Sequence, residues 1–452
     1  MISKKNLYLF LALSVGLTCC TKEKKSAVVP FTPVPPIVET SAIFKNPAAT
    51  IDERVKDLLK RMTLAEKVAQ MIQIERSVAT ENAVKTLNAG SILSAGGSQP
   101  NAGNSALAWA NQYDMFQDLA LKSRLGIPLI YGVDAVHGHN NLQGAVIFPH
   151  NIGLGCTRNA ALVENAFKVV AEEVAGTGID WTFAPCIAVA RDERWGRTYE
   201  SFGESPALVS EMGVSAIKGL QGTALTPASI LACAKHFVAD GATTGGKDQG
   251  NAQLDETALR AIHLPAYKAA IDAGVGSIMV SYSSWNSSKM HSHKYLVTDV
   301  LKTELGFKGF VISDYQGIDQ LPGDYATQVQ NSVNAGVDMV MLPFETEKFM
   351  STLQELVTSG RVSQERIDDA VSRILRVKFQ LGLFETSFTD RMKTSTIGSA
   401  NHRTLARECV RQSVVLLKND NHVLPLNKTD KIHVGGKIAD DLGKQCGGWT
   451  IN

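Results

Sequence analysis

Five polar side chains that follow hydrophobic β-type runs are the residues of this sequence best suited to chemistry. They are Asp134, Lys235, His236, Tyr282 and Asp314. A carboxylate at the end of a buried strand can act as a nucleophile, and charged or polar neighbours can hold a substrate in register. Each residue also has a structural explanation, since Asp314 could cap the next helix, Lys235 could be solvated and His236 could pack in the core. We therefore weigh them together rather than singly.

Two further clusters carry less chemical information. Arginine and aspartate residues crowd positions 191–197, where a surface network of ion pairs would explain them equally well. His137 and His139 flank a glycine and suggest a metal, but no third ligand follows at a suitable spacing. The cysteines after residue 150 form neither a CxxC pair nor a Cys/His cluster with zinc spacing. We therefore expect no metal and no cofactor.

The elements that must position these side chains alternate along the chain between strands and helices. β-type runs separated by segments of helical period indicate a parallel α/β fold. A barrel brings all its strand ends to one mouth, whereas an open sheet collects ligands mainly at one switch point. We therefore predict a (β/α)8 TIM-type barrel over residues 45–385, with room for an irregular first strand. The predicted strands cover residues 90–93, 127–136, 181–189, 230–237, 277–285, 309–313 and 337–342.

Local signals also place two helix starts and a second unit. Thr63 and Glu66 form a capping box, and Pro206 fits the first turn of a helix. Residues 386–400 have the composition of a polar linker, and residues 401–452 contain a helical pattern followed by a β-type run over 414–419. Because about 50 residues bury too little apolar surface to fold unaided, we expect residues 401–452 to be the incomplete start of a C-terminal α/β sandwich domain in a truncated chain.

The N-terminus has the pattern of an export signal. A basic start precedes an apolar run over residues 7–17, which is too short to span a membrane. Cys19 or Cys20 stands where cleavage is expected, so residues 1–20 are predicted to be a lipoprotein-type signal peptide, with plain secretion as the alternative. Proline-rich residues 21–44 are predicted to be an extended tether. We expect a periplasmic or outer-membrane lipoprotein that contacts the membrane only through its lipid.

The composition excludes several classes of protein. The 452 residues are 44% hydrophobic and 20% charged, which supports a large core and excludes wholesale disorder. Lys+Arg 45 against Asp+Glu 44 gives a net charge of +1, so no basic excess attracts nucleic acid. The 37 glycines show no fixed period, which excludes collagen-like and solenoid folds.

Taken together, the sequence resembles glycoside hydrolase family 3, the β-glucosidases and exo-β-glucanases. Each matching segment is weak alone, but together they are highly specific and follow the family order over nearly all of residues 45–452. The closing DLGKQCGGWT (441–450) is similar to the subgroup that acts on β-1,3 and β-1,4 glucans and oligosaccharides. The other segments are GVDAVHG (132–138), RDERWGRTYESFGE (191–204), AKHFVADG (234–241), MVSYSSWN (279–286), VISDYQGID (311–319), AGVDMVML (335–342) and SVVLLKND (413–420).

The resemblance implies a retaining hydrolase that releases glucose from the non-reducing end of β-glucans or oligosaccharides. Asp314 matches the family nucleophile, which would form a glycosyl-enzyme that water then hydrolyses. Tyr315 stands where many relatives carry tryptophan, a mild change between flat aromatic side chains. The family residues that bind the terminal sugar are matched by Asp134, Arg197, Lys235 and His236. Tyr282 matches a subsite tyrosine, and Trp449 matches an indole that stacks on the neighbouring sugar.

A larger departure from the family concerns the proton donor. Two-domain relatives carry the general acid/base as a glutamate of the second domain, after the GGWT stretch, so we expect it beyond Asn452. Single-domain N-acetylglucosaminidases of the family use an Asp-His pair on the loop after KHF, and residues 238–253 contain no histidine. A β-N-acetylglucosaminidase remains an alternative, as does a non-catalytic sugar-binding lipoprotein.

Overall fold

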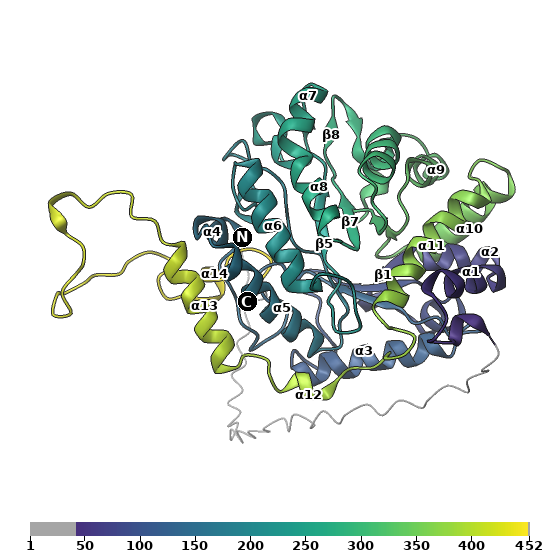
Figure 1. Ribbon diagram of the computed structural model, residues 1–452, viewed down its shortest axis with the longest axis horizontal. Coiled ribbons are helices and arrows are strands. Elements are labelled where there is room, and N and C mark those ends of the chain that lie inside the picture. The colour runs from purple at the N-terminus through teal and green to yellow at the C-terminus, as the bar shows by residue number, and fades with distance from the viewer. Residues whose placement is uncertain (1–41, 451–452) are drawn as a thin grey trace, which may run out of the picture.

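The computed structural model describes residues 42–450, and its centre is a barrel of eight short parallel strands (Figure 1). Neighbouring strands pair in the orders β11-β1-β2-β3-β4 and β10-β7-β5. Bridges from Trp181 to Leu231 and from Ile312 to Met339 join the two sheets at both seams, so the predicted TIM-type barrel is confirmed. The strands are β1 (Ile72–Glu75), β2 (Ser91–Ser94), β3 (Ile130–Val133), β4 (Trp181–Thr182), β5 (Cys233–Phe237), β7 (Ser277–Val280), β10 (Phe310–Ile312) and β11 (Val340–Met341).

The predicted signal peptide, with Cys19 and Cys20, lies outside the described residues, as does the tether up to residue 41. Within residues 42–450, no helix has the length and apolar character needed to cross a membrane.

Helices between the strands cover the outside of the barrel. α6 (Pro206–Gln221) packs against both α5 (Ala160–Ala175) and α8 (Pro265–Asp272). The predicted helix starts are present, because Thr63 caps α2 (Leu64–Gln70) in a capping box and Pro206 opens α6. The others are α1 (Ile51–Arg61), α3 (Ala106–Leu121), α4 (Asn151–Cys156), α7 (Glu256–Ala258), α9 (Tyr325–Ala335), α10 (Thr346–Thr358), α11 (Gln364–Gln380) and the wider helical segments Asn82–Thr86, Leu259–His263 and Tyr295–Glu304.

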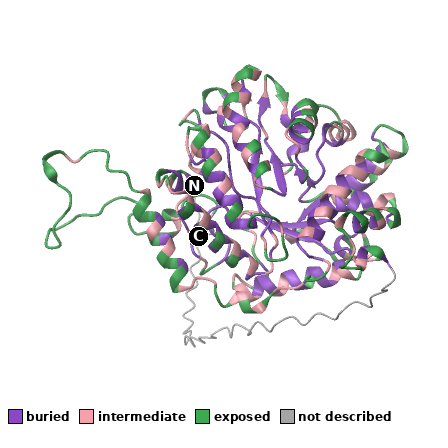
Figure 2. Cartoon of the chain, in the orientation of Figure 1, coloured by how far each residue is buried: buried purple, intermediate pink, exposed green. Residues whose placement is uncertain are grey.

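Large aromatic side chains fill the inside of the barrel. Trp181 meets Phe183 and Phe310 edge to face, with ring centroids 4.9 and 5.2 Å apart. The indole Nε1–H of Trp181 donates to Ser277 Oγ at 3.0 Å, so its polar edge is satisfied although the ring is fully buried. Figure 2 shows the barrel strands buried throughout. This packed interior supports the loops that leave the strand ends.

Some elements differ from the expectation drawn from the sequence. β1 is absent from the predicted runs because its four residues, IQIE, alternate apolar and polar side chains over too short a stretch to stand out. The predicted run 181–189 contains only two strand residues, Trp181–Thr182, since the chain soon reaches Pro185, which lacks a backbone donor. α1 and α10 were also not predicted.

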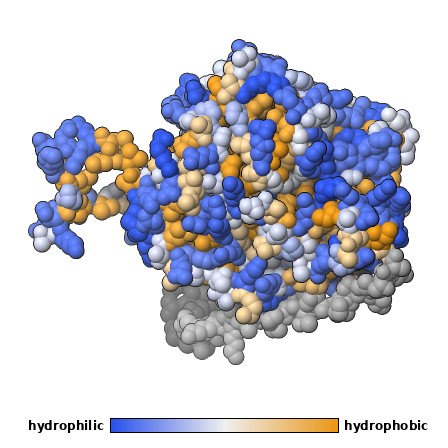
Figure 3. Space-filling view, viewed as in Figure 1, coloured by the Kyte–Doolittle hydropathy of each residue, from blue (hydrophilic) through white to orange (hydrophobic). Residues whose placement is uncertain are grey.

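The chain after the barrel first packs on it and then leaves it. α12 (Arg391–Thr394) and α13 (Ala400–Ser413) contact α5, and α13 also contacts α4. Residues 414–440 then form the arm at the left of Figure 1, which Figure 3 shows with apolar side chains on its surface. The predicted strand over 414–419 is wrong, because no strand among the described residues lies beside it to pair with. α14 (Leu442–Gln445) follows, and residues 447–450 contact the barrel.

Candidate active site

A cavity of about 490 Å³ lies at the carboxyl ends of the barrel strands. Loops that follow the strands line it, as expected for a TIM-type barrel. The C-terminal segment adds one wall through its indole. All eight side chains predicted from the sequence line this cavity: Asp134, Arg197, Lys235, His236, Tyr282, Asp314, Tyr315 and Trp449.

Asp314 comes shortly after β10 and is only 8% exposed. Its backbone N–H donates to His291 Nε2 at 3.0 Å, and its Oδ1 accepts the N–H of Tyr315 at 2.7 Å. Oδ2 has no hydrogen-bond partner among the described residues. Burial raises the pKa of Asp314 to about 6, although Arg197 and Lys235 oppose the rise. A carboxylate with one oxygen fixed and the other free is suited to nucleophilic attack.

Lys235 and Asp134 form a pair across two strand ends. Lys235 lies within β5, Asp134 directly follows β3, and Lys235 Nζ donates to Asp134 Oδ1 at 3.4 Å. Burial by itself would lower the pKa of Lys235, but the carboxylates of Asp134 and Glu200 outweigh it and raise the pKa, so the ammonium stays charged. Since an ammonium has three N–H groups and a carboxylate two oxygens, both retain capacity for sugar hydroxyls.

Arg197 joins a buried carboxylate to a buried imidazole. Its Nε and Nη2 donate to the two oxygens of Glu200 at 2.6 and 3.0 Å, and Nη2 also lies 3.1 Å from His236 Nε2. Burial would raise the pKa of Glu200, but Arg197 prevails and lowers it. The guanidinium carbon lies 5.7 Å from the ring of Trp449. This bidentate ion pair holds the guanidinium in one orientation at the cavity wall.

Aromatic side chains form the rim of the cavity. The hydroxyl of Tyr282 donates to the carbonyl of Tyr315, and burial together with the nearby Asp314 raises the pKa of Tyr282. Trp449 is 41% exposed, and its backbone carbonyl accepts the Nδ2–H of Asn140 at 2.7 Å. Rings fixed in this way offer flat apolar faces to a bound sugar.

Sequence reasoning missed Glu200, His291 and Asp248. Glu200 lies three residues after Arg197 in a short helical turn, and this spacing, typical of ion pairs, could have revealed it. His291 supports Asp314 from a distant loop, and no local pattern marks it. Asp248 lines the cavity with Oδ1 accepting the indole N–H of Trp195 at 3.1 Å.

One cluster among residues 42–450 has donor atoms close enough for a metal: those of Cys186, His236 and Asp240 lie within 4.8 Å of one another. Burial raises the pKa of the Cys186 thiol, which therefore stays protonated. Arg197 and Lys235 place two positive charges beside His236. These charges and the neutral thiol disfavour a cation, and a hydrogen bond between His236 and Asp240 accounts for their approach.

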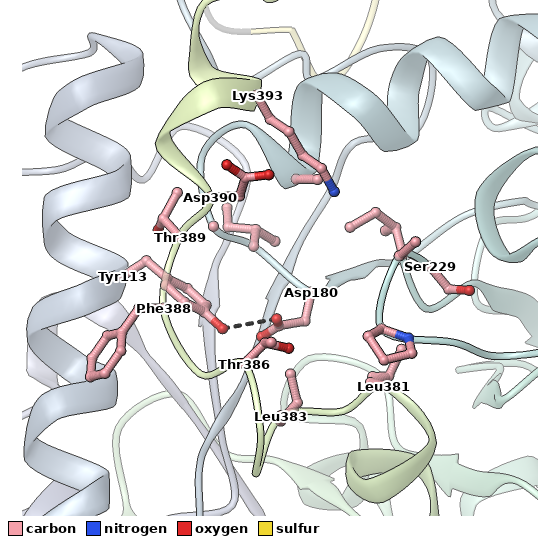
Figure 4. Close-up of a pocket in the computed structure, with 16 residues that line it drawn as sticks. Tyr113, Asp180, Ser229, Leu381, Leu383, Thr386, Phe388, Thr389, Asp390 and Lys393 are labelled. Atoms are coloured by element: carbon pink, nitrogen blue, oxygen red, sulfur yellow. Dashed lines mark hydrogen bonds between the residues drawn. The ribbon is translucent and has the colours of Figure 1, made fainter. Parts of the chain in front are cut away.

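A second cavity, of about 310 Å³, lies at the amino ends of the strands (Figure 4). Asp180, just before β4, accepts the hydroxyl of Tyr113 at 2.8 Å and the N–H of Tyr131 at 3.2 Å, one on each carboxylate oxygen. Burial raises the pKa of Asp180 to about 7. Since both oxygens are occupied and this face of a TIM-type barrel contributes mainly to stability, we place the chemistry in the other cavity.

Comparisons with known proteins identify the family of the chain. A family model described as the glycosyl hydrolase family 3 N terminal domain matches residues 63–377. The periplasmic beta-glucosidase of Salmonella typhimurium is 36% identical over 426 residues, covering 90% of this chain and 54% of that protein. The lysosomal beta glucosidase of Dictyostelium discoideum is 33% identical over 436 residues, covering 89% and 53%.

Among solved structures, an exo-1,3/1,4-beta-glucanase from a Pseudoalteromonas species has a TM-score of 0.86 to this chain at 42% identity. The match covers 88% of this chain and 52% of the glucanase. The chain thus spans about half the length of the curated relatives it matches.

Proposed function

Because this chain belongs to glycosyl hydrolase family 3, we propose that it hydrolyses β-glucosides with retention of the anomeric configuration. The observation that carries the proposal is the unpartnered Oδ2 of buried Asp314, which lines the cavity together with Arg197 and Lys235. A retaining mechanism needs such a carboxylate beside the anomeric carbon. Since the relatives are named beta-glucosidases and an exo-glucanase, the proposed substrate is a β-glucan or oligosaccharide that loses glucose from its non-reducing end.

In the first proposed step, Asp314 Oδ2 attacks the anomeric carbon and forms a glycosyl ester. The bond from that carbon to the departing oxygen breaks, and its electron pair leaves with the oxygen, which takes a proton from a general acid. The N–H of Tyr315 steadies Oδ1 during the attack. A leaving group that is stable as an anion, such as a nitrophenolate, needs little of this protonation.

In the second proposed step, water attacks the anomeric carbon from the opposite face and gives up a proton to a general base. The ester bond breaks, and Asp314 departs as a carboxylate, so the configuration is inverted twice and retained overall. Arg197 and Lys235 stabilise the negative charge that returns to Asp314, because both are fixed cations that lower its pKa.

The two ends of the cavity suit two parts of the substrate. Asp134, Arg197 and Lys235 offer charged hydrogen bonds, which we assign to the hydroxyls of the terminal glucose. The neutral imidazole of His236 lines the same end of the cavity and is assigned to the same sugar. The aromatic rim of Tyr282, Tyr315 and Trp449 is assigned to the neighbouring sugar, whose ring faces are apolar.

The location of the protein is a further proposal. We propose that the chain is exported and that Cys19 or Cys20 carries a lipid after the signal peptide is cleaved directly before that cysteine. The Salmonella typhimurium relative is named periplasmic, which supports export.

Turnover of 4-nitrophenyl β-glucoside tests the proposed function. The unaltered chain should release nitrophenolate, and Asp314→Ala should lower the rate by about 10³-fold or more. Asp272→Asn, which alters an exposed carboxylate at the end of α8, is the matched control. Proton NMR should show β-glucose as the first product, and α-glucose would contradict retention. Preferred cleavage of the 4-nitrophenyl N-acetyl-β-glucosaminide would favour that alternative, and glucose binding without turnover would favour the binding protein.

A further inference from the structure

Asp240 is a buried carboxylate that the proposed mechanism does not use. It follows β5 after a turn in which Ala239 has a left-handed backbone conformation, with φ of 69°. Asp240 Oδ2 lies 2.7 Å from His236 Nδ1, and Oδ1 accepts the N–H of Gly241 at 3.0 Å. Both carboxylate oxygens are therefore engaged, and one side of the imidazole of His236 is fixed.

The other ring nitrogen of His236 faces two groups of opposite character. Nε2 lies 3.1 Å from Arg197 Nη2 and 3.6 Å from Asp314 Oδ2. Because a guanidinium can only donate hydrogen bonds, Nε2 must offer its lone pair to Arg197. Burial and then the positive charge of Arg197 lower the pKa of His236 well below its usual range, so the ring carries a single proton. That proton belongs on Nδ1, where Asp240 accepts it.

We propose that Asp240 is a positioning residue that holds His236 in its Nδ1–H tautomer and thereby keeps Oδ2 of Asp314 free to attack. This inference rests on the proposed function of Asp314. In the opposite tautomer, Nε2–H would face the N–H groups of Arg197 and repel them, and it could turn to Oδ2 of Asp314, which lies 3.6 Å away. A hydrogen bond there would occupy the oxygen that must attack the sugar, and Arg197 would lose one of its fixed partners.

Asp240→Asn tests this inference because it keeps the shape of the side chain but replaces one acceptor by a donor. The N–H of Gly241 needs the remaining oxygen, so the new NH2 group faces His236 Nδ1. An NH2 group can only donate, which forces the ring proton onto Nε2. We expect kcat/KM for 4-nitrophenyl β-glucoside to fall on the order of 10²- to 10⁴-fold, as is typical when a site histidine is held in the wrong tautomer.

The tautomer itself is read from the ¹⁵N chemical shifts of His236, assigned by their loss in His236→Gln. The spectra are recorded above about pH 8, because burial raises the pKa of Asp240 to about 7 and the argument needs its carboxylate form. The unaltered chain should show a protonated Nδ1 and Asp240→Asn a protonated Nε2. Asp272→Asn, the same change at an exposed site, should alter neither the tautomer nor the rate. Retention of the Nδ1 proton in Asp240→Asn, or an Nε2 proton in the unaltered chain, would overturn the proposal.

A double variant separates positioning from a general loss of structure. In a His236→Gln background, Asp240→Asn should change kcat/KM by less than about threefold, because the ring on which it acts is gone. An equal loss in both backgrounds would overturn the proposal. If Asp240→Asn does not fold, the tautomer of the unaltered chain decides the question. Failure of the unaltered chain to cleave any β-glucoside would contradict the proposed function, whereas a wrong tautomer would contradict this inference alone.

Discussion

Lys235→Met tests the electrostatic environment of Asp314. Burial raises the pKa of Asp314 to about 6, and Lys235 is one of the cations that oppose this rise. Methionine has an unbranched side chain of similar length, so it fills the buried position of Lys235 but removes the charge. Asp314 should therefore keep its proton to a higher pH, and the acid limb of the kcat/KM profile should move to higher pH.

The size of the shift follows from the neighbours of Asp314. An opposite charge within about 4–6 Å shifts a carboxyl pKa by about one to three units, and Lys235 acts less strongly than Arg197, so we expect about one unit. At pH 6 the ionised fraction of Asp314 would then fall from about one half to about one tenth, a roughly fivefold loss of rate. Above about pH 8 the carboxylate is ionised in both chains, and the remaining loss measures the sugar contacts of Lys235.

A pH profile of kcat/KM for 4-nitrophenyl β-glucoside between about pH 5 and 9 measures this shift, since it reports the ionisations of the free enzyme. Asp240 also titrates in this range, because burial raises its pKa to about 7. The neighbouring charges that act on it are Arg197 and Glu200 rather than Lys235, so the pKa of Asp240 should not shift in Lys235→Met. Lys393→Met, at the second cavity, is the control and should leave the profile unchanged. An acid limb that does not move in Lys235→Met, or that moves to lower pH, would refute the electrostatic assignment.

Three further changes test other parts of the proposal. Glu200→Gln replaces one of the two carboxylate oxygens that accept from Arg197, so kcat/KM should fall about ten- to a hundredfold, and an unchanged value would show that the guanidinium is held in other ways. Trp449→Ala should weaken the binding of laminaribiose or cellobiose about tenfold through lost stacking, measured as competitive inhibition of 4-nitrophenyl β-glucoside turnover, and an unchanged inhibition constant would exclude the indole from the sugar site. Replacing both Cys19 and Cys20 by Ser should move the protein from the membrane to the soluble fraction after cell lysis, and continued sedimentation with membranes would contradict a lipid anchor.

Most residues of the cavity could be predicted from the sequence, because a barrel brings together strand ends that are far apart along the chain. Residues such as Asp134 and Asp314 stand at the ends of hydrophobic runs, and parallel strands bring such ends to one mouth. The resemblance to the family added Arg197 and Trp449, which lie in loops whose paths no local pattern predicts. β1 escaped prediction because four alternating residues do not stand out from a loop.

The supporting contacts could not be predicted, because they depend on how loops return to the strand ends. Asp240 reaches His236 only through the turn at Ala239, and His291 reaches the backbone of Asp314 from another loop. The strand predicted at 414–419 failed because a local pattern was present but its pairing partner was not. Its composition favours a strand, but strand formation requires a neighbour, and the described residues provide none.

The most direct test of the central proposal is to trap the glycosyl-enzyme and locate it. In an activated 2-deoxy-2-fluoro-glucosyl inhibitor, the fluorine slows both steps, but the good leaving group still departs easily. The covalent ester therefore accumulates on the nucleophile. Peptide mass spectrometry should find the sugar on Asp314, and Asp314→Ala should take up no label. A label on Asp134, Asp248 or any other carboxylate would contradict the account, as would turnover of the aryl glucoside by Asp314→Ala at an undiminished rate.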